Sequence, residues 1–249
     1  MSAKRRAIGF DRKIQLDWLD ATADWAAQGH SVVDIRERLE QSLEAKVAGT
    51  GPHSARGKTM TVLLHIWVLV PDALVPLRAE GLALLRDRSG RDRLPLHWGM
   101  CMATYPFFRD VAATTGRLLS LQGTVALSQI VRRMTESWGE RSTLIRATQR
   151  LVRSFVEWGV LVETDERGIF APGPKVTVAH GNGIGPWLLE AGLSNCEKQA
   201  RPFRSLVGAT SFFPLDMKFS PRDVGSSARL EVYRQGFDED MVMLKAGTS

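Results

Sequence analysis

Residues 125–171 read VALSQIVRRMTESWGERSTLIRATQRLVRSFVEWGVLVETDERGIFA, and this stretch decides the fold expected for the middle of the chain. Its apolar spacing predicts a short helix over 125–138, a tight connection over 139–141, and a second helix that Ser142 caps and Gly159 ends. Apolar residues at 160–163 and 169–170 predict two strands around turn residues 165–168, the second continuing beyond Pro172 and Pro174 to 176–178. The expected unit is therefore helix, turn, helix and two-stranded hairpin.

The second of these helices, Thr143 to Trp158, is amphipathic. At about 100° per residue, its basic and amide side chains, with the capping serine, lie within roughly 60° of Arg146; these are Ser142, Gln149, Arg150 and Arg153. Its apolar side chains lie roughly opposite: Leu144, Ala147, Leu151, Phe155 and Trp158. Such a helix can dock on a core with one face and present arginines to a binding partner with the other.

Positive charge is concentrated in the same region. The chain has a formal net charge of +6, with 33 Lys and Arg against 27 Asp and Glu, and 25 of the 33 are Arg. Six arginines fall between Arg132 and Arg153, against Glu136 and Glu140. Arginine suits phosphate oxygens and guanine edges, although a GC-rich genome or a merely solvated face also produces arginine enrichment. The candidate DNA-binding residues are Arg132, Arg133, Arg141, Ser142, Thr143, Arg146, Gln149, Arg150, Arg153 and Arg167.

This segment, residues 123–180, resembles the winged helix-turn-helix superfamily of DNA-binding domains. The resemblance implies binding of double-stranded DNA, with the helix after the turn in the major groove and Arg167 of the wing at the backbone or minor groove. Winged helices also serve as protein–protein modules. A scaffold that binds a partner protein therefore stays open, and an exposed patch of Trp98, Phe107 and Phe108 would favour it.

Two further stretches, LHWGMCMATYPFFRDVAATTGRLL and RSTLIRATQRLVRSFVEWGVL, resemble the BrxA family of accessory proteins in BREX phage-defence systems. The shared features are an aromatic-Arg-Asp element, here Phe107 to Asp110, and a helical module that ends in a Gly-then-Leu step. The resemblance implies DNA binding without known catalysis, beside the other proteins of a prokaryotic antiviral defence complex.

The flanking regions complete a mainly α fold with a small β component. Residues 1–122 are expected to form a helical bundle; its helices span 11–28, 31–49, 55–70, 72–86, 94–105 and 106–122. Residues 181–249 are expected to form a small α+β unit or a second winged-helix-like module, with helices over 185–193 and 197–206 and a hairpin of 229–235 and 240–244 around Gly236. Interleaved acids there favour a solvated surface over a continued DNA track.

No motif points to catalysis or to a cofactor. Gly49 to Thr59 ends like a phosphate-binding loop, but Pro52 stands where that loop needs glycine. His97 and Cys101, four residues apart, lack a third metal ligand nearby, so packing explains them better. Residues 60–77 are too short and too interrupted to cross a membrane, and two cysteines without a secretion signal suggest a cytoplasmic protein.

These patterns favour a non-enzymatic double-stranded DNA-binding protein with no cofactor or metal. The alternatives are the protein–protein scaffold and a ligand-responsive transcription regulator. In the regulator, the bundle would act as sensor and would hold a homo-oligomer together, and half-sites in the DNA would lie about one helical turn apart.

Overall fold

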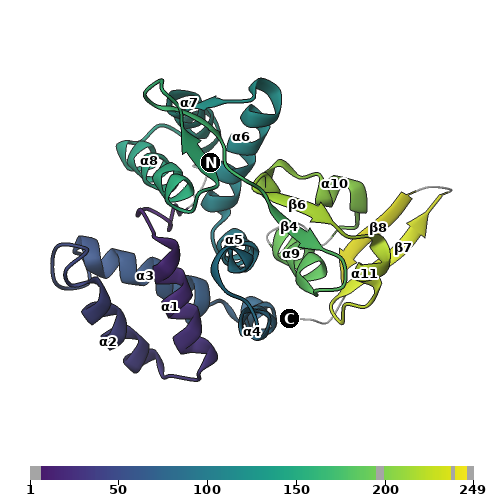
Figure 1. The fold of residues 1–249 in the computed structure, drawn as a ribbon, viewed down its shortest axis with the longest axis horizontal. Coiled ribbons are helices and arrows are strands. Elements are labelled where there is room, and N and C mark those ends of the chain that lie inside the picture. Colours follow the sequence, from purple (N-terminus) through teal and green to yellow (C-terminus); the bar gives the residue numbers. More distant parts are fainter. Residues whose placement is uncertain (1–6, 195–198, 237–238, 246–249) are drawn as a thin grey trace, which may run out of the picture.

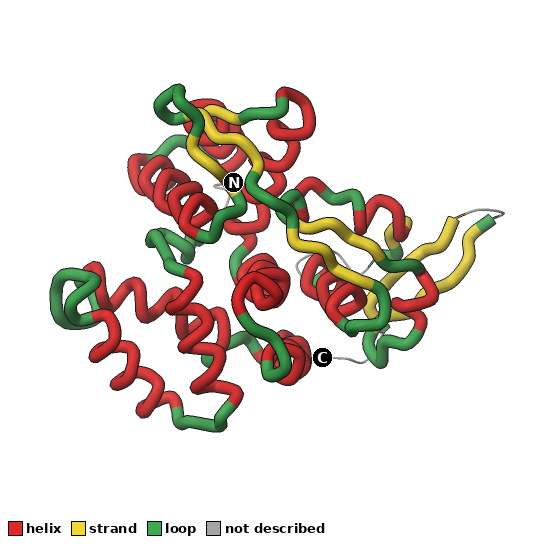
Figure 2. The backbone as a smooth tube through the Cα atoms, viewed as in Figure 1, coloured by secondary structure: helices red, strands yellow, loops and turns green. Residues whose placement is uncertain are grey.

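The computed structural model describes residues 7–194, 199–236 and 239–245, and it is mainly helical with three small sheets, which confirms the expected fold class (Figures 1 and 2). The first part of the chain is a helical bundle. Its helices are α1 (Leu16–Ala27), α2 (Val32–Leu43), α3 (Ala55–Trp67), α4 (Val75–Leu85), α5 (Leu94–Thr104) and α6 (Pro106–Gln122), with 3-10 turns η1 (Asp72–Leu74) and η2 (Gly90–Arg93).

Local signals set several of these boundaries. Ser31 and Asp34 form a capping box at the start of α2, in which the Ser31 hydroxyl accepts from the Asp34 amide at 3.1 Å and the Asp34 carboxylate accepts from the Ser31 amide at 3.2 Å. This reciprocal pair satisfies two amides that a helix start otherwise leaves unbonded. Pro106 lies at the first position of α6, where its missing N–H costs nothing.

The first sheet unit comprises α6, β1 (Val125–Ala126), α7 (Leu127–Trp138), α8 (Ser142–Glu157), β2 (Leu161–Glu163) and β3 (Ile169–Pro172). Its sheet is antiparallel, in the order β1-β3-β2. Residues 125 and 126, predicted as helix, are a strand because Val125 pairs with Phe170 and buries its side chain. The helix–turn–helix element is confirmed, and Gly139 supplies its turn with a φ of 82°.

Two predicted details of this region are wrong. The N-cap of α8 is Arg141, in an extended conformation, and Ser142 is the first helical residue. Residues 176–179 do not extend the hairpin; as β4 (Val176–Ala179) they pair in parallel with β6 (Leu215–Lys218). Pro172 and Pro174 carry no N–H, so they cannot continue the ladder, and the chain leaves the first sheet between them.

The second sheet unit comprises α9 (Ile184–Leu193), β5 (Arg201–Pro202), α10 (Phe203–Val207), η3 (Thr210–Phe212), β6, α11 (Pro221–Gly225), β7 (Leu230–Gln235) and β8 (Glu239–Leu244). Its antiparallel sheet has the order β5-β8-β7, and the predicted hairpin around Gly236 is confirmed. The helix predicted over 197–206 begins only at Phe203; residues 197 and 198 lie outside the described part of the chain. Pro202 disfavours helical geometry at Arg201, which pairs with β8 instead.

The bundle and the first sheet unit share one hydrophobic core, whereas the second sheet unit adds a small cluster of its own. The shared core is richest in aromatic rings around Phe155, which lies 5.0 Å from Trp98 and 5.5 Å from Phe108, measured between ring centroids. Within the described ranges no single helix is long and apolar enough to cross a membrane; α3 and η1–α4 reach that length only as a pair bent by 57°.

Candidate nucleic-acid interface

Helix α8 is amphipathic in the sense that the sequence predicts. Leu144, Ala147, Leu151 and Phe155 are at most 1% exposed, so one side of the helix is part of the core. Arg146 and Arg153 are exposed on the other side. The Arg146 guanidinium contacts its own helix, with Nε donating to the Ser142 carbonyl at 3.4 Å, while Gln149 is half-buried. Two arginines of α8 are therefore presented to solvent.

Arg150, the third predicted arginine of α8, has a different role because the N-terminal segment, residues 8–14, lies along one flank of this helix (Figure 1). Its guanidinium donates to the carbonyl of Asp11 at 3.0 Å. Ile14 is held at both ends, since its amide donates to Ser154 Oγ at 2.8 Å and its carbonyl accepts from Trp158 Nε1 at 2.9 Å. Arg150 thus helps to fasten this segment and is only partly exposed.

Helix α7 carries Arg132 and Arg133, whose side chains are 66% and 54% exposed. Arg133 lies 3.0 Å from Glu136, one turn along the same helix, and such exposed pairs contribute little to stability. Arg133 also lines a cavity of about 290 Å³ between α6 and α7, together with Arg117 and the exposed Leu121. The structure therefore groups Arg133 with α6, a partnership that the spacing within α7 does not reveal.

Arg141 and Thr143, on either side of the start of α8, line a cleft of about 360 Å³. The other walls are the first turns of α3 and the N-terminal segment; the lining residues are Ile8, Gly9, Asp11, Lys58, Thr61, Arg141 and Thr143. Arg141 is half-buried, whereas Thr143 and Lys58 are exposed. Lys58 was not among the predicted site residues, because it lies 83 positions before Arg141 and no local pattern links the two.

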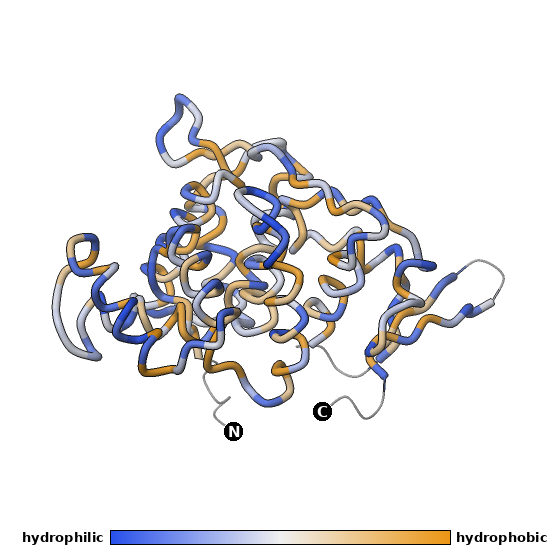
Figure 3. The backbone as a smooth tube through the Cα atoms, turned by 60° about the horizontal axis from the view of Figure 1, so that its bottom comes forward, coloured by the Kyte–Doolittle hydropathy of each residue, from blue (hydrophilic) through white to orange (hydrophobic). Residues whose placement is uncertain are grey.

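Arg167 lies in the turn between β2 and β3, where Gly168 has a φ of 81°. Asp165, Glu166 and Arg167 are all exposed. Figure 3 shows this turn as a hydrophilic loop that stands off the body of the molecule. Arg167 is thus free to approach a partner, but two neighbouring carboxylates offset its charge.

The loop before α3, which resembles a phosphate-binding loop in its last residues, uses its amides internally. The Gly57 amide donates to Ser54 Oγ at 3.0 Å and the Lys58 amide to the Ser54 carbonyl at 3.1 Å. A methyl group on Gly57 would lie 2.3 Å from the Gly51 carbonyl oxygen, so this glycine allows the loop to fold tightly back onto α3. The preceding element is helix α2, not the strand that such a loop requires.

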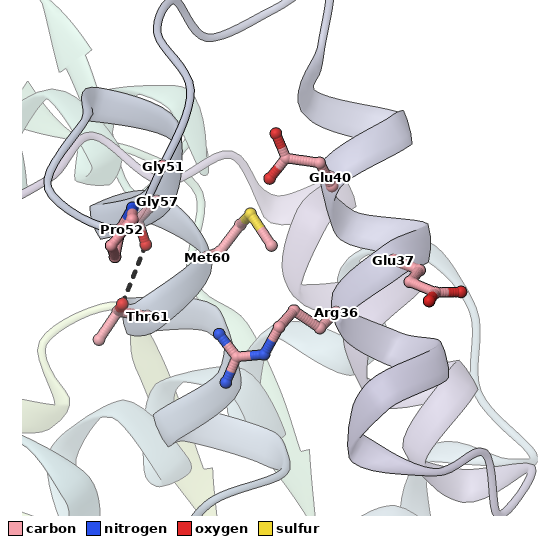
Figure 4. Close-up of a pocket in the computed structure, with 8 residues that line it drawn as sticks. All are labelled: Arg36, Glu37, Glu40, Gly51, Pro52, Gly57, Met60 and Thr61. Carbon is pink, nitrogen blue, oxygen red and sulfur yellow. Dashed lines mark hydrogen bonds between the residues drawn. The ribbon is translucent and has the colours of Figure 1, made fainter.

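A cavity of about 340 Å³ separates this loop and α3 from α2 (Figure 4). Arg36 extends from α2 toward α3, while Glu37 and Glu40 lie along the same side of α2, and Met60 projects between the two helices. The Thr61 hydroxyl donates to the Gly57 carbonyl at 2.9 Å. Acidic and basic groups are mixed here, which does not favour an anionic ligand.

His97 and Cys101 are packed side chains, as expected. Trp67 Nε1 donates to His97 Nδ1 at 3.0 Å, and because indole can only donate, His97 Nε2 carries the proton that it shares with Asp20 at 2.9 Å. Burial raises the pKa of the Cys101 thiol well above its usual value. Across the described ranges, no three His, Cys, Asp or Glu side chains come together as a metal site would require.

Neither protein-family models, nor curated proteins, nor solved structures give a significant match to this chain. Its function is therefore inferred from the geometry above. The distinguishing features are the helix–turn–helix, the short antiparallel sheet beside it, and the exposed arginines on α8.

Proposed function

We propose that the chain is a non-enzymatic double-stranded DNA-binding protein and that its first sheet unit acts as a winged helix. The observation that carries this proposal is the order of elements: helix, short strand, two helices joined by a turn, and a hairpin whose second strand pairs with the short strand. This is the arrangement of winged helix-turn-helix domains, in which the helix after the turn enters the major groove. In this chain that helix is α8.

The size and chemistry of α8 suit a major groove. Its 16 residues extend over about 24 Å at ~1.5 Å per residue, and a major groove about 12 Å wide admits a helix. Arg146 and Arg153 lie outermost and can reach phosphates or guanine edges. Arg150 gives one of its donors to Asp11, so in this proposal it orients the helix against the N-terminal segment more than it contacts DNA.

The remaining predicted residues would contact the DNA backbone. Arg132 and Arg133 are exposed on α7, and Arg167 is exposed in the wing. Contacts of this kind fix the position of a protein on duplex DNA without reading its sequence, and they make affinity strongly dependent on salt. The proposal therefore accounts for general DNA affinity and leaves sequence preference to the side chains of α8.

The resemblance to the BrxA family extends this proposal to an accessory role beside larger phage-defence proteins in a prokaryotic cytoplasm. That extension stays a prediction, as does the transcription-regulator alternative. The aromatic patch that would favour a protein scaffold is absent from the surface, because Trp98, Phe107 and Phe108 are fully buried.

The test is a fluorescence-anisotropy titration of the full chain with a random-sequence duplex at several salt concentrations. We expect log affinity to fall linearly with log salt. The double variant Arg146→Ala with Arg153→Ala should weaken binding and reduce the slope by up to about 2, since each lost phosphate contact contributes ~0.9. Its melting temperature should stay unchanged, because both side chains are exposed.

The matched control removes two exposed arginines of α2, Arg36→Ala with Arg38→Ala, and so lowers the net charge equally. Binding by this control should stay close to that of the unaltered chain. Equal losses in both double variants would mean that general charge, not α8, drives binding. Absence of binding by the unaltered chain at low salt would contradict the proposed function itself.

A further inference from the structure

The cleft at the start of α8 joins two parts of the molecule that are distant in sequence. Lys58 comes from the second turn of α3 in the bundle, whereas Arg141 and Thr143 flank the first residue of α8. The N-terminal segment closes the third side through Ile8, Gly9 and Asp11. The cleft therefore lies between the bundle and the helix that the proposed function places in the major groove.

The walls of this cleft are held in place by the core. Phe10 is fully buried, with its ring 5.5 Å from both Tyr105 and Phe108, measured between centroids. Gly9 has a φ of 66°, and a methyl group there would lie 2.6 Å from the Tyr105 ring, so glycine is what allows the segment to pass this close. A wall fixed in this way can hold a ligand without first becoming ordered, which lowers the cost of binding.

The lining of the cleft is positive overall. Lys58 and Arg141 contribute two positive charges, and Asp11 is the acidic residue among its walls. The Asp11 carboxylate lies 3.3 Å from the Arg12 guanidinium, so a further arginine offsets its charge. Thr143 is exposed and adds a hydroxyl donor. Two cations and a hydroxyl from different elements are the groups that commonly bind a phosphate diester.

We propose that this cleft binds a backbone phosphate of duplex DNA, so that the DNA-binding surface extends from the winged helix onto the bundle through Lys58. The inference rests on the proposed function, because with α8 in the major groove the backbone that borders the groove passes the ends of this helix. Lys58 and Arg141 would hold that strand from its two sides. The bundle then takes part directly in DNA binding.

The test compares Lys58→Ala, Lys58→Glu and Lys58→Arg in the full chain, again with a random-sequence duplex at several salt concentrations. Lys58→Ala should weaken binding about three- to tenfold near 100 mM salt and lower the salt slope by ~0.9, the value for one phosphate contact. Lys58→Glu should weaken binding further because it adds repulsion. Lys58→Arg keeps the charge and should bind like the unaltered chain.

Lys46→Ala is the control, since Lys46 is an exposed lysine that does not line the cleft. Melting temperatures of all four variants should match, because both lysines are exposed. If Lys58→Ala and Lys46→Ala bind equally well while the Arg146 and Arg153 double variant binds poorly, this inference is overturned and the proposed function stands. If the unaltered chain does not bind the duplex, both are overturned.

Discussion

The two sheet units of this molecule have the same strand order but different helices. In each, a two-residue strand pairs with the second strand of a hairpin, giving β1-β3-β2 in the first unit and β5-β8-β7 in the second. The helices before the first hairpin, α7 and α8, have 12 and 16 residues, whereas α10 and α11 have 5 each. At ~1.5 Å per residue, α11 extends over about 8 Å, too little to follow a groove. Strand order alone therefore does not make a DNA-binding unit.

The arginines of the two units are also placed differently. Arg146 and Arg153 of the first unit point into solvent, whereas Arg229 of the second unit lies between two carboxylates. Its Nε donates to Glu190 of α9 at 2.6 Å, and its NH2 group donates to Glu80 of α4. Arg229 thus ties the second unit to the bundle. The position of an arginine, more than the number of arginines, separates a binding surface from an internal tie.

The first prediction concerns the cores, where the largest effect is expected. Phe155→Ala should lower the free energy of unfolding by about 3–5 kcal/mol, because a fully buried ring is lost from the aromatic cluster that joins α8 to the bundle. Urea unfolding followed by tryptophan fluorescence measures this, and all seven tryptophans precede residue 188. The bundle and the first unit should unfold together at a lower urea midpoint.

The counterpart in the second unit is Leu230→Ala, which removes a side chain that is 1% exposed from the separate cluster. Its main effect should appear in far-ultraviolet circular dichroism, with a smaller change in tryptophan fluorescence. If both variants shift both signals equally, the two cores are not independent in stability, and that difference between the units does not hold.

The second prediction concerns the tie between the second unit and the bundle. Arg229→Met should destabilise the chain by about 2–3 kcal/mol at pH 7, less than the ~3–5 kcal/mol typical of a fully buried pair because Arg229 is partly exposed. Burial already raises the pKa of Glu190, against the opposing hydrogen bond and charge of Arg229. Removing Arg229 should raise this pKa further and leave a buried, unpaired carboxylate at neutral pH.

The sign of the pH dependence follows from that pKa. As the pH falls from 7 toward the usual glutamate value of 4.5, Glu190 in the variant takes up a proton and the unpaired charge disappears. The loss of stability should therefore shrink with falling pH, as measured by urea unfolding at pH 7 and pH 5. Glu190→Gln combined with Arg229→Met should show no such change, and a constant loss in the single variant would exclude Glu190 as the cause.

Local patterns predicted much of the first unit but not its long-range contacts. The apolar repeat of α8 predicted that Phe155 and Leu151 are buried, and Gly139 predicted the turn before it. The contact between Arg150 and Asp11 spans 139 residues, so the helical pattern could show that Arg150 lies near the basic face but not that another segment covers it. Lys58 joined the candidate site for the same reason, through the packing of α3 beside the start of α8.

The second unit was harder to predict because its elements are short. Five-residue helices carry too few apolar positions to show a period, and Pro202 changed an expected helix into a strand. The parallel pairing of β4 with β6 joins residues 39 positions apart in the sequence, and nothing near Val176 specifies it. Tertiary packing, not local preference, decides structure in such segments.

The smallest expected effect tests whether the second unit contributes to DNA binding at all. Arg204 of α10 and Arg222 of α11 are exposed, as Arg146 and Arg153 are, so Arg204→Ala with Arg222→Ala removes the same charge from the unit with short helices. We expect a change in affinity below about twofold at 150 mM salt, where a Debye length of about 8 Å screens charges that do not touch DNA. The salt slope should stay unchanged, because no phosphate contact is lost. A slope reduced by ~2 would instead show that both sheet units contact the backbone, and the shared strand order would then matter more than helix length.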